Sequence, residues 1–157
     1  MDSVLSVLVV DESEAFLAVT RHWIESRRDL RLVGTARDAL AALEAAADLS
    51  PDLVIVEAVL PGVDGFRLTR AIKSRANAPL VVIVTFHASA AARDEAFAAG
   101  ADGFLAKGDF SDELDALLEA WKTARPDRAN LTPPAIPARR ESRTVPDPSG
   151  RGRRDAP

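Results

Sequence analysis

Residues 51–66 read PDLVIVEAVLPGVDGF, and their pattern predicts a strand, a loop and the start of a helix. Asp52–Val56 (DLVIV) is a short apolar run without polar alternation, which predicts a strand buried on both faces. Pro61-Gly62 and Asp64-Gly65 then mark a loop, and apolar residues follow at helical spacing from Phe66. A buried strand, a loop and a helix in this order form the unit from which parallel sheets are built.

The same unit recurs on both sides of this stretch. Further strands are expected at Val4–Val10, Leu30–Thr35, Leu80–Thr85 and around Phe104-Leu105. Further helices are expected from Ser13 through Ile24, over Ala39–Leu49 after Asp38 as N-cap, and at about Ser89–Ala99 and Ser111–Ala124. Five strands alternating with five helices predict an α/β fold, a doubly wound three-layer sandwich around a parallel five-stranded sheet. In such sheets ligands bind beyond the carboxyl ends of the strands.

The composition changes after Ala124. Residues 1–124 hold 12 Lys and Arg against 20 Asp and Glu, a net charge of −8, whereas residues 125–157 hold 8 Arg against 4 acids, a net charge of +4. Seven of the ten prolines also lie after position 124, with few large apolar residues among them. Such a segment cannot bury enough surface to offset the entropy of ordering it. We therefore expect a folded domain over 1–124 and a disordered Pro/Arg-rich tail over 125–157.

Several classes of protein are excluded or disfavoured by composition and motif. The chain has no Cys and only two His, which disfavours disulfide, thiol and zinc chemistry. The turn Val10–Glu14 contains no glycine, so it matches neither nucleotide-binding fingerprint, and no G-x-S-x-G elbow is present. The N-terminal apolar run is too short for a membrane span or a signal sequence. We expect a soluble, cytoplasmic protein that is not an enzyme.

Polar side chains gather where the predicted strands end. Asp11 and Glu12 follow the first strand, Glu57 and Thr85 end the third and fourth, and Lys107 follows the fifth. Clustered hard oxygen ligands suit Mg²⁺, whereas a lysine and a hydroxyl suit a phosphoryl group. The pattern therefore indicates phosphoryl chemistry or its remnant.

Four segments give the chain a resemblance to a known family, the response-regulator receiver domains of two-component signalling. They are VLVVDES (7–13), PDLVIVEAVLPGVDGF (51–66), PLVVIVTF (79–86) and GADGFLAKGDF (100–110), in the family's order and spacing. The resemblance covers roughly residues 3–124. It implies a flavodoxin-like fold with strand order 2-1-3-4-5.

The resemblance also implies roles for individual residues. It assigns Mg²⁺ binding to Asp11, Glu12, Glu57 and the backbone carbonyl of Val59, and phosphoryl contact or switching to Thr85, Lys107 and the aromatic Phe104. The phosphoacceptor position, which is Asp in the family, falls on Glu57, because Pro61 fixes the register. Gly108 stands where the family often has proline, and Phe86 where it usually has a small residue that leaves access to the site.

Glu57 is expected to accept phosphate poorly. Glu is one methylene longer than Asp, which displaces the carboxylate by roughly 1.5 Å, and errors of about 1 Å can cost on the order of 10²-fold in rate. The longer arm brings negative charge toward Lys107 and Thr85. Two outcomes stay open, partial constitutive activation and an inert salt bridge, and Mg²⁺ binding is expected to be weakened.

We therefore expect a stand-alone receiver-like protein of a phosphorelay that acts by protein contact. The partner would be a histidine kinase or a downstream signalling protein, and the contact surface would comprise the helix at 89–99, the strand at Phe104-Leu105 and the helix at 111–124. One alternative is a receiver that still accepts a phosphoryl group with Mg²⁺. Another is nucleic-acid binding through the arginine-rich tail, which is a weak signal because four acids are interspersed. Trp23 and Trp121 are expected in the core, with a homodimer surface as the alternative.

Overall fold

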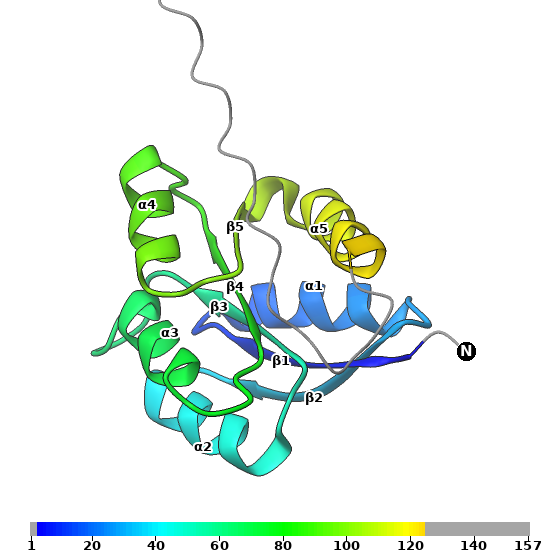
Figure 1. The fold of residues 1–157 in the computed structure, drawn as a ribbon, viewed down its shortest axis with the longest axis horizontal. Coiled ribbons are helices and arrows are strands. Elements are labelled where there is room, and N and C mark those ends of the chain that lie inside the picture. The colour runs from blue at the N-terminus through cyan, green and yellow to red at the C-terminus, as the bar shows by residue number, and fades with distance from the viewer. Residues whose placement is uncertain (1–2, 125–157) are drawn as a thin grey trace, which may run out of the picture.

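The computed structural model describes residues 3–124, in which five strands alternate with five α-helices (Figure 1). The strands are β1 (Leu5–Val10), β2 (Leu30–Ala36), β3 (Leu53–Glu57), β4 (Leu80–Thr85) and β5 (Gly103–Ala106). The helices are α1 (Glu14–Glu25), α2 (Ala39–Leu49), α3 (Gly65–Lys73), α4 (Ala90–Ala98) and α5 (Phe110–Ala124), the last preceded by a 3₁₀ turn at Lys107–Asp109. The α/β fold is confirmed.

All strand pairs are parallel, and the order β2-β1-β3-β4-β5 is the predicted one. Alternate residues of β3 point to opposite faces of the sheet. Leu53 and Ile55 pack with side chains of α1 and α5, whereas Val54 and Val56 pack with side chains of α2 and α3. Figure 1 shows α1 and α5 on one side of the sheet and the other helices across it. The doubly wound three-layer sandwich is therefore confirmed.

Polar side chains begin four of the helices. Ser13, Asp38, Asp64 and Ser89 each accept a hydrogen bond from the backbone N–H three residues later. Such N-caps satisfy donors that a helix leaves unpaired at its first turn. Most of the predicted element boundaries lie within one or two residues of those in the structure.

The β3 boundary shows why the remaining differences arise. Asp52 was predicted as the first strand residue, but its carboxylate accepts hydrogen bonds from the backbone N–H and the hydroxyl of Ser6, at 2.8 and 2.9 Å. The strand itself begins at Leu53 and continues to Glu57, which pairs in register with Val84. Glu57 is thus the last residue of the ladder.

The two tryptophans lie where the core interpretation places them. Trp121 is buried, and Trp23 is half-buried against the same cluster between the sheet, α1 and α5.

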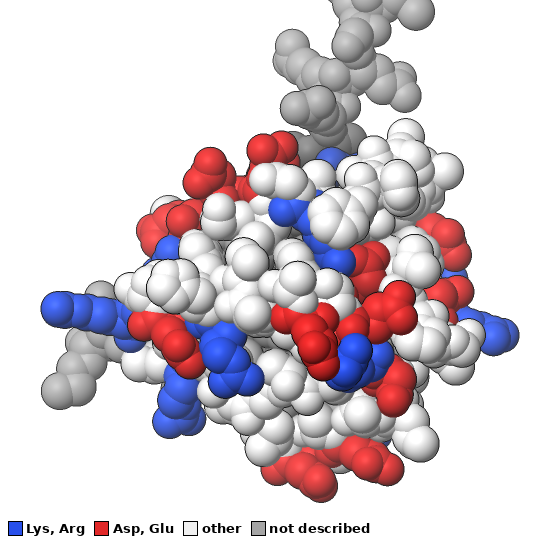
Figure 2. Space-filling view, turned by 180° about the vertical axis from the view of Figure 1, so that it is seen from behind, with Lys and Arg blue, Asp and Glu red and all other residues white. Residues whose placement is uncertain are grey.

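The predicted disordered tail over 125–157 lies outside the described residues. Within residues 3–124 no helix is long and apolar enough to cross a membrane. On the face seen from behind, acidic and basic side chains are interspersed (Figure 2).

Candidate functional site

The parallel register brings the predicted site residues to one edge of the sheet. Val10 pairs with Val56, so Asp11 and Glu57 follow neighbouring positions at the ends of β1 and β3. Thr85 pairs with Ala106, the last residue of β5. Lys107 follows Ala106 and therefore lies just beyond the same edge. Residues far apart in the sequence thus meet where parallel strands end.

Lys107 is at the centre of the site. Its ammonium lies 2.7 Å from Asp11 Oδ2 and forms a second ion pair with Glu57 Oε2. The exposed fractions of the three side chains are 3% for Lys107, 1% for Asp11 and 7% for Glu57. Buried charges are tolerated when they are paired in this way.

The carboxylates are also fixed by the backbone. Asp11 Oδ1 accepts a hydrogen bond from Ser13 N at 2.8 Å, and Glu57 Oε1 accepts one from Val59 N at 3.0 Å. The contact of Asp11 Oδ2 with Lys107 is an ion pair, but its geometry is not that of a hydrogen bond. Each carboxylate therefore has one oxygen held by its own loop and one facing the lysine.

Two aromatic rings complete the surroundings of Lys107. Its ammonium lies 4.2 Å from the ring centroid of Phe16 and 4.7 Å from that of Phe86. Both distances are within the range at which a cation is attracted to the face of an aromatic ring. The sequence prediction missed Phe16, which fits the apolar stripe of a helix and carries no other signal.

The other predicted residues are less closely involved. The hydroxyl of Thr85 accepts a hydrogen bond from His87 N at 3.2 Å, in its own loop. Glu12 is exposed, and its carbonyl accepts from the Arg37 guanidinium. Phe104 is half-buried and packs against a small cluster that includes Ile83 and Ala96. The structure therefore brings Asp11, Glu57 and Lys107 into direct contact and leaves Glu12 and Phe104 at the periphery.

Mg²⁺ is the ion that the predicted ligands imply. Carboxylate oxygens suit the ion chemically. In this arrangement, however, the ammonium of Lys107 lies against both Asp11 and Glu57. Among residues 3–124 no three His, Asp or Glu side chains are grouped so that they could hold a metal. In this arrangement the two carboxylates that the ion would need are already paired with the lysine.

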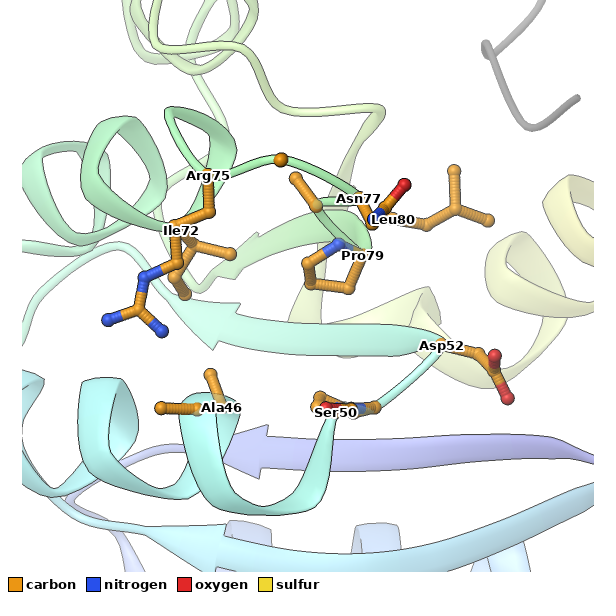
Figure 3. Close-up of a pocket in the computed structure, with 12 residues that line it drawn as sticks. Ala46, Ser50, Asp52, Ile72, Arg75, Asn77, Pro79 and Leu80 are labelled. Carbon is orange, nitrogen blue, oxygen red and sulfur yellow. The ribbon is translucent and has the colours of Figure 1, made fainter.

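A separate hollow of about 400 Å³ lies at the opposite edge of the sheet (Figure 3). It is bounded by the ends of α2 and α3 and by the starts of β3 and β4, with Ser50, Asp52, Arg75 and Pro79 among its lining residues. None of the predicted site residues lines it. It is therefore distinct from the carboxylate site.

Comparisons with known proteins agree with this geometry. Residues 7–122 match the response regulator receiver domain family. The chain is 47% identical over 83 residues to protein-glutamate methylesterase/protein-glutamine glutaminase 5 of Myxococcus xanthus, which is 53% of this chain and 24% of that protein. It thus spans about a quarter of that relative's length.

Solved structures show the same likeness. A two-component response regulator of the LuxR family from Aurantimonas superposes with a TM-score of 0.72 at 32% identity, over 78% of this chain and 88% of that one. The response regulator domain of Thermotoga maritima CheB superposes with a TM-score of 0.66 at 32% identity, over 74% of this chain and 92% of that one. The chain therefore belongs to the response regulator receiver domain family.

Proposed function

We propose that this receiver domain transmits its signal by protein contact and is defective in phosphorylation at Glu57. One observation carries the proposal: the Glu57 carboxylate is buried and already paired with Lys107. Lys107 is the group that the family resemblance assigns to the incoming phosphoryl. An acceptor that is occupied by this cation is a poor nucleophile, and its longer side chain displaces the attacking oxygen from in-line geometry.

The same contact supports a weak resemblance to the phosphorylated state. Glu57 reaches Lys107 without a phosphoryl group, but it carries one negative charge where a phosphoryl group carries about two. The hydroxyl of Thr85 accepts from His87 N–H, so its contact in this structure is within its own loop. The mimicry that we propose is therefore partial and confined to the lysine.

We further propose that Mg²⁺ binds weakly, because an ion entering between Asp11 and Glu57 would have to displace the ammonium of Lys107.

The proposed contact surface comprises α4, β5 and α5, with half-buried Phe104 on β5. The partner would be a histidine kinase or a downstream signalling protein. The similarity to the response regulator domain of CheB supports a role in signalling rather than catalysis by this domain.

The proposal is tested by incubating the protein with a small-molecule phosphodonor and Mg²⁺ and measuring the intact mass. We expect no adduct on the natural chain and a single phosphoryl adduct on Glu57→Asp, which restores the shorter acceptor. An adduct on the natural chain that disappears in Glu57→Gln would contradict the proposal. An adduct that persists in Glu57→Gln and is released by hydroxylamine would identify another carboxylate, such as Asp11, as the acceptor, and would favour the alternative of a receiver that still accepts a phosphoryl group.

A further inference from the structure

The hollow at the starts of β3 and β4 plays no part in the proposed function (Figure 3). Its volume of about 400 Å³ lies within the range of clefts that bind small molecules. Its lining divides into buried apolar side chains, which include Ile72 and Leu80, and exposed polar ones, which include Ser50, Arg75 and Asn77. Apolar walls with a few polar groups are typical of ligand sites.

Two backbone positions in the wall of the hollow are strained. Among the non-glycine residues of 3–124, Ser50 and Asn77 alone have a positive φ, at 45° and 56°, and both line the hollow. Asparagine tolerates this left-handed conformation, but serine does so less readily. Ser50 is the C-cap of α2, a position where glycine would adopt the same backbone without steric cost. A serine hydroxyl is therefore kept at the rim of the hollow despite the strain.

Arg75 is the positively charged residue that lines the hollow. Figure 3 shows its side chain extending from the end of α3 toward α2. Within residues 3–124 its guanidinium forms no ion pair or hydrogen bond. Asp52 also lines the hollow, but its carboxylate accepts two hydrogen bonds from Ser6 and points away from Arg75 in Figure 3. An anion that enters the hollow therefore meets a guanidinium whose donors are unoccupied.

The other end of the hollow has a different chemistry. Ser50 stands at the end of α2, apart from the Arg75 guanidinium (Figure 3). The last carbonyls of a helix lack partners within the helix and carry partial negative charge. This end therefore suits a neutral group that can donate a hydrogen bond, such as a hydroxyl, and disfavours a second negative charge.

We propose that the hollow binds an elongated organic monocarboxylate with a hydroxyl at its far end. The planar guanidinium of Arg75 pairs with the carboxylate through parallel hydrogen bonds, as its fork geometry allows. The aliphatic body packs on the apolar wall that includes Ile72 and Leu80, and the hydroxyl meets Ser50. This site is separate from the carboxylate site and does not depend on phosphorylation of Glu57.

The test is a titration of the natural chain with ω-hydroxyhexanoate, followed by NMR of the backbone amides. We expect saturable shifts at lining residues such as Ala46 and Asn77, and none at Lys107 on the opposite edge of the sheet. Hexanediol has the same aliphatic body without the charge. It should bind at least about tenfold more weakly, because hydrogen bonds between charged groups are the stronger ones.

Two variants assign the two ends of the ligand. Arg75→Gln should weaken the binding of ω-hydroxyhexanoate at least about tenfold. Arg70→Gln removes another exposed arginine, from within α3, and should leave the affinity unchanged. Ser50→Ala keeps the backbone and removes the hydroxyl, so it should weaken ω-hydroxyhexanoate by about threefold and leave hexanoate unaffected.

Three results would overturn the proposal. They are saturable shifts that are missing from the lining residues or centred on Lys107, equal affinities for ω-hydroxyhexanoate and hexanediol, and unchanged binding in Arg75→Gln. The titration contains neither a phosphodonor nor Mg²⁺. Its failure is therefore distinguishable from a failure of the proposed function, which the intact mass of the phosphodonor reaction measures.

Discussion

The carboxylate of Glu57 and the ammonium of Lys107 form an ion pair at the end of the sheet, with both side chains buried. Lys107 also contacts Asp11 at 2.7 Å, so one cation balances two carboxylates. In a low-dielectric site this balance matters, because an unpaired buried charge is costly. Glu57, which stands where the family has Asp, therefore shares with Asp11 the cation that balances the charge of the site.

The first prediction concerns Mg²⁺. Shortening the acceptor in Glu57→Asp withdraws the carboxylate from Lys107 and so frees its oxygens for an ion that prefers oxygen ligands. We expect Glu57→Asp to bind Mg²⁺ at least about tenfold more tightly than the natural chain, a difference of about 1.4 kcal/mol. Calorimetric titration measures both affinities, with Ca²⁺ as a comparison ion. Equal affinities would show that Glu57 does not weaken the site.

The second prediction concerns Gly65, the first residue of α3. A Cβ at this position would lie 2.2 Å from the carbonyl oxygen of Glu57 and 3.0 Å from Ala58 Cα, and backbone atoms cannot move aside as a flexible side chain can. We expect Gly65→Ala to lower the free energy of unfolding by about 3 kcal/mol. Gly108→Ala, whose Cβ would meet nothing within 4 Å, is the matched control and should be near neutral. A neutral Gly65→Ala in urea unfolding would contradict the packing described for this loop.

The third prediction concerns pH and a charge cluster that joins the α1–β2 loop to α5. Asp29 accepts two hydrogen bonds from the Arg27 guanidinium and one from Lys122 at 2.7 Å. The hydrogen bonds from Arg27, and then that from Lys122, hold the pKa of the Asp29 carboxyl well below its usual range. A carboxyl with a lowered pKa stabilises the fold above its unfolded pKa, near 4, and loses that contribution as the pH falls below it.

We therefore expect Asp29→Asn to be less stable than the natural chain by about 1 kcal/mol at pH 7, a small value because the cluster is partly exposed. The difference should shrink as the pH is lowered from 5 to about 2. Urea unfolding at several pH values measures it, and Asp94→Asn on the exposed side of α4 serves as the control. A difference that stays constant over this range would rule out Asp29 as its source.

The sequence predicts the fold well because each level of information agrees. Apolar runs predict the strands, and polar N-caps such as Asp38 predict where helices begin. The strand-end rule places Asp11, Glu57 and Lys107 at one edge, where the structure joins them. These features depend on local pattern and on topology, which a single sequence carries.

Other features depend on side-chain conformation and could not be predicted. Phe16 and Phe86 surround Lys107 only once α1, the β4–α4 loop and β5 have come together. Arg27 and Asp115 are 88 residues apart and meet only in the folded chain. Asp52 follows the pattern of a strand but instead binds Ser6. Such contacts are set by tertiary packing, which leaves no periodic signal in the sequence.

The Glu57–Lys107 pair holds the carboxylate site together, and a double-mutant cycle measures how strongly the two side chains stabilise one another. The free energies of unfolding of the natural chain, Glu57→Gln, Lys107→Met and the double variant are measured in urea. Lys107→Met leaves two buried carboxylates without their cation, so we expect it to cost about 3 kcal/mol or more. In the double variant the loss should be smaller than the sum of the single losses by about 2 kcal/mol. Additive losses would contradict the claim, because they would show that the two side chains do not stabilise one another.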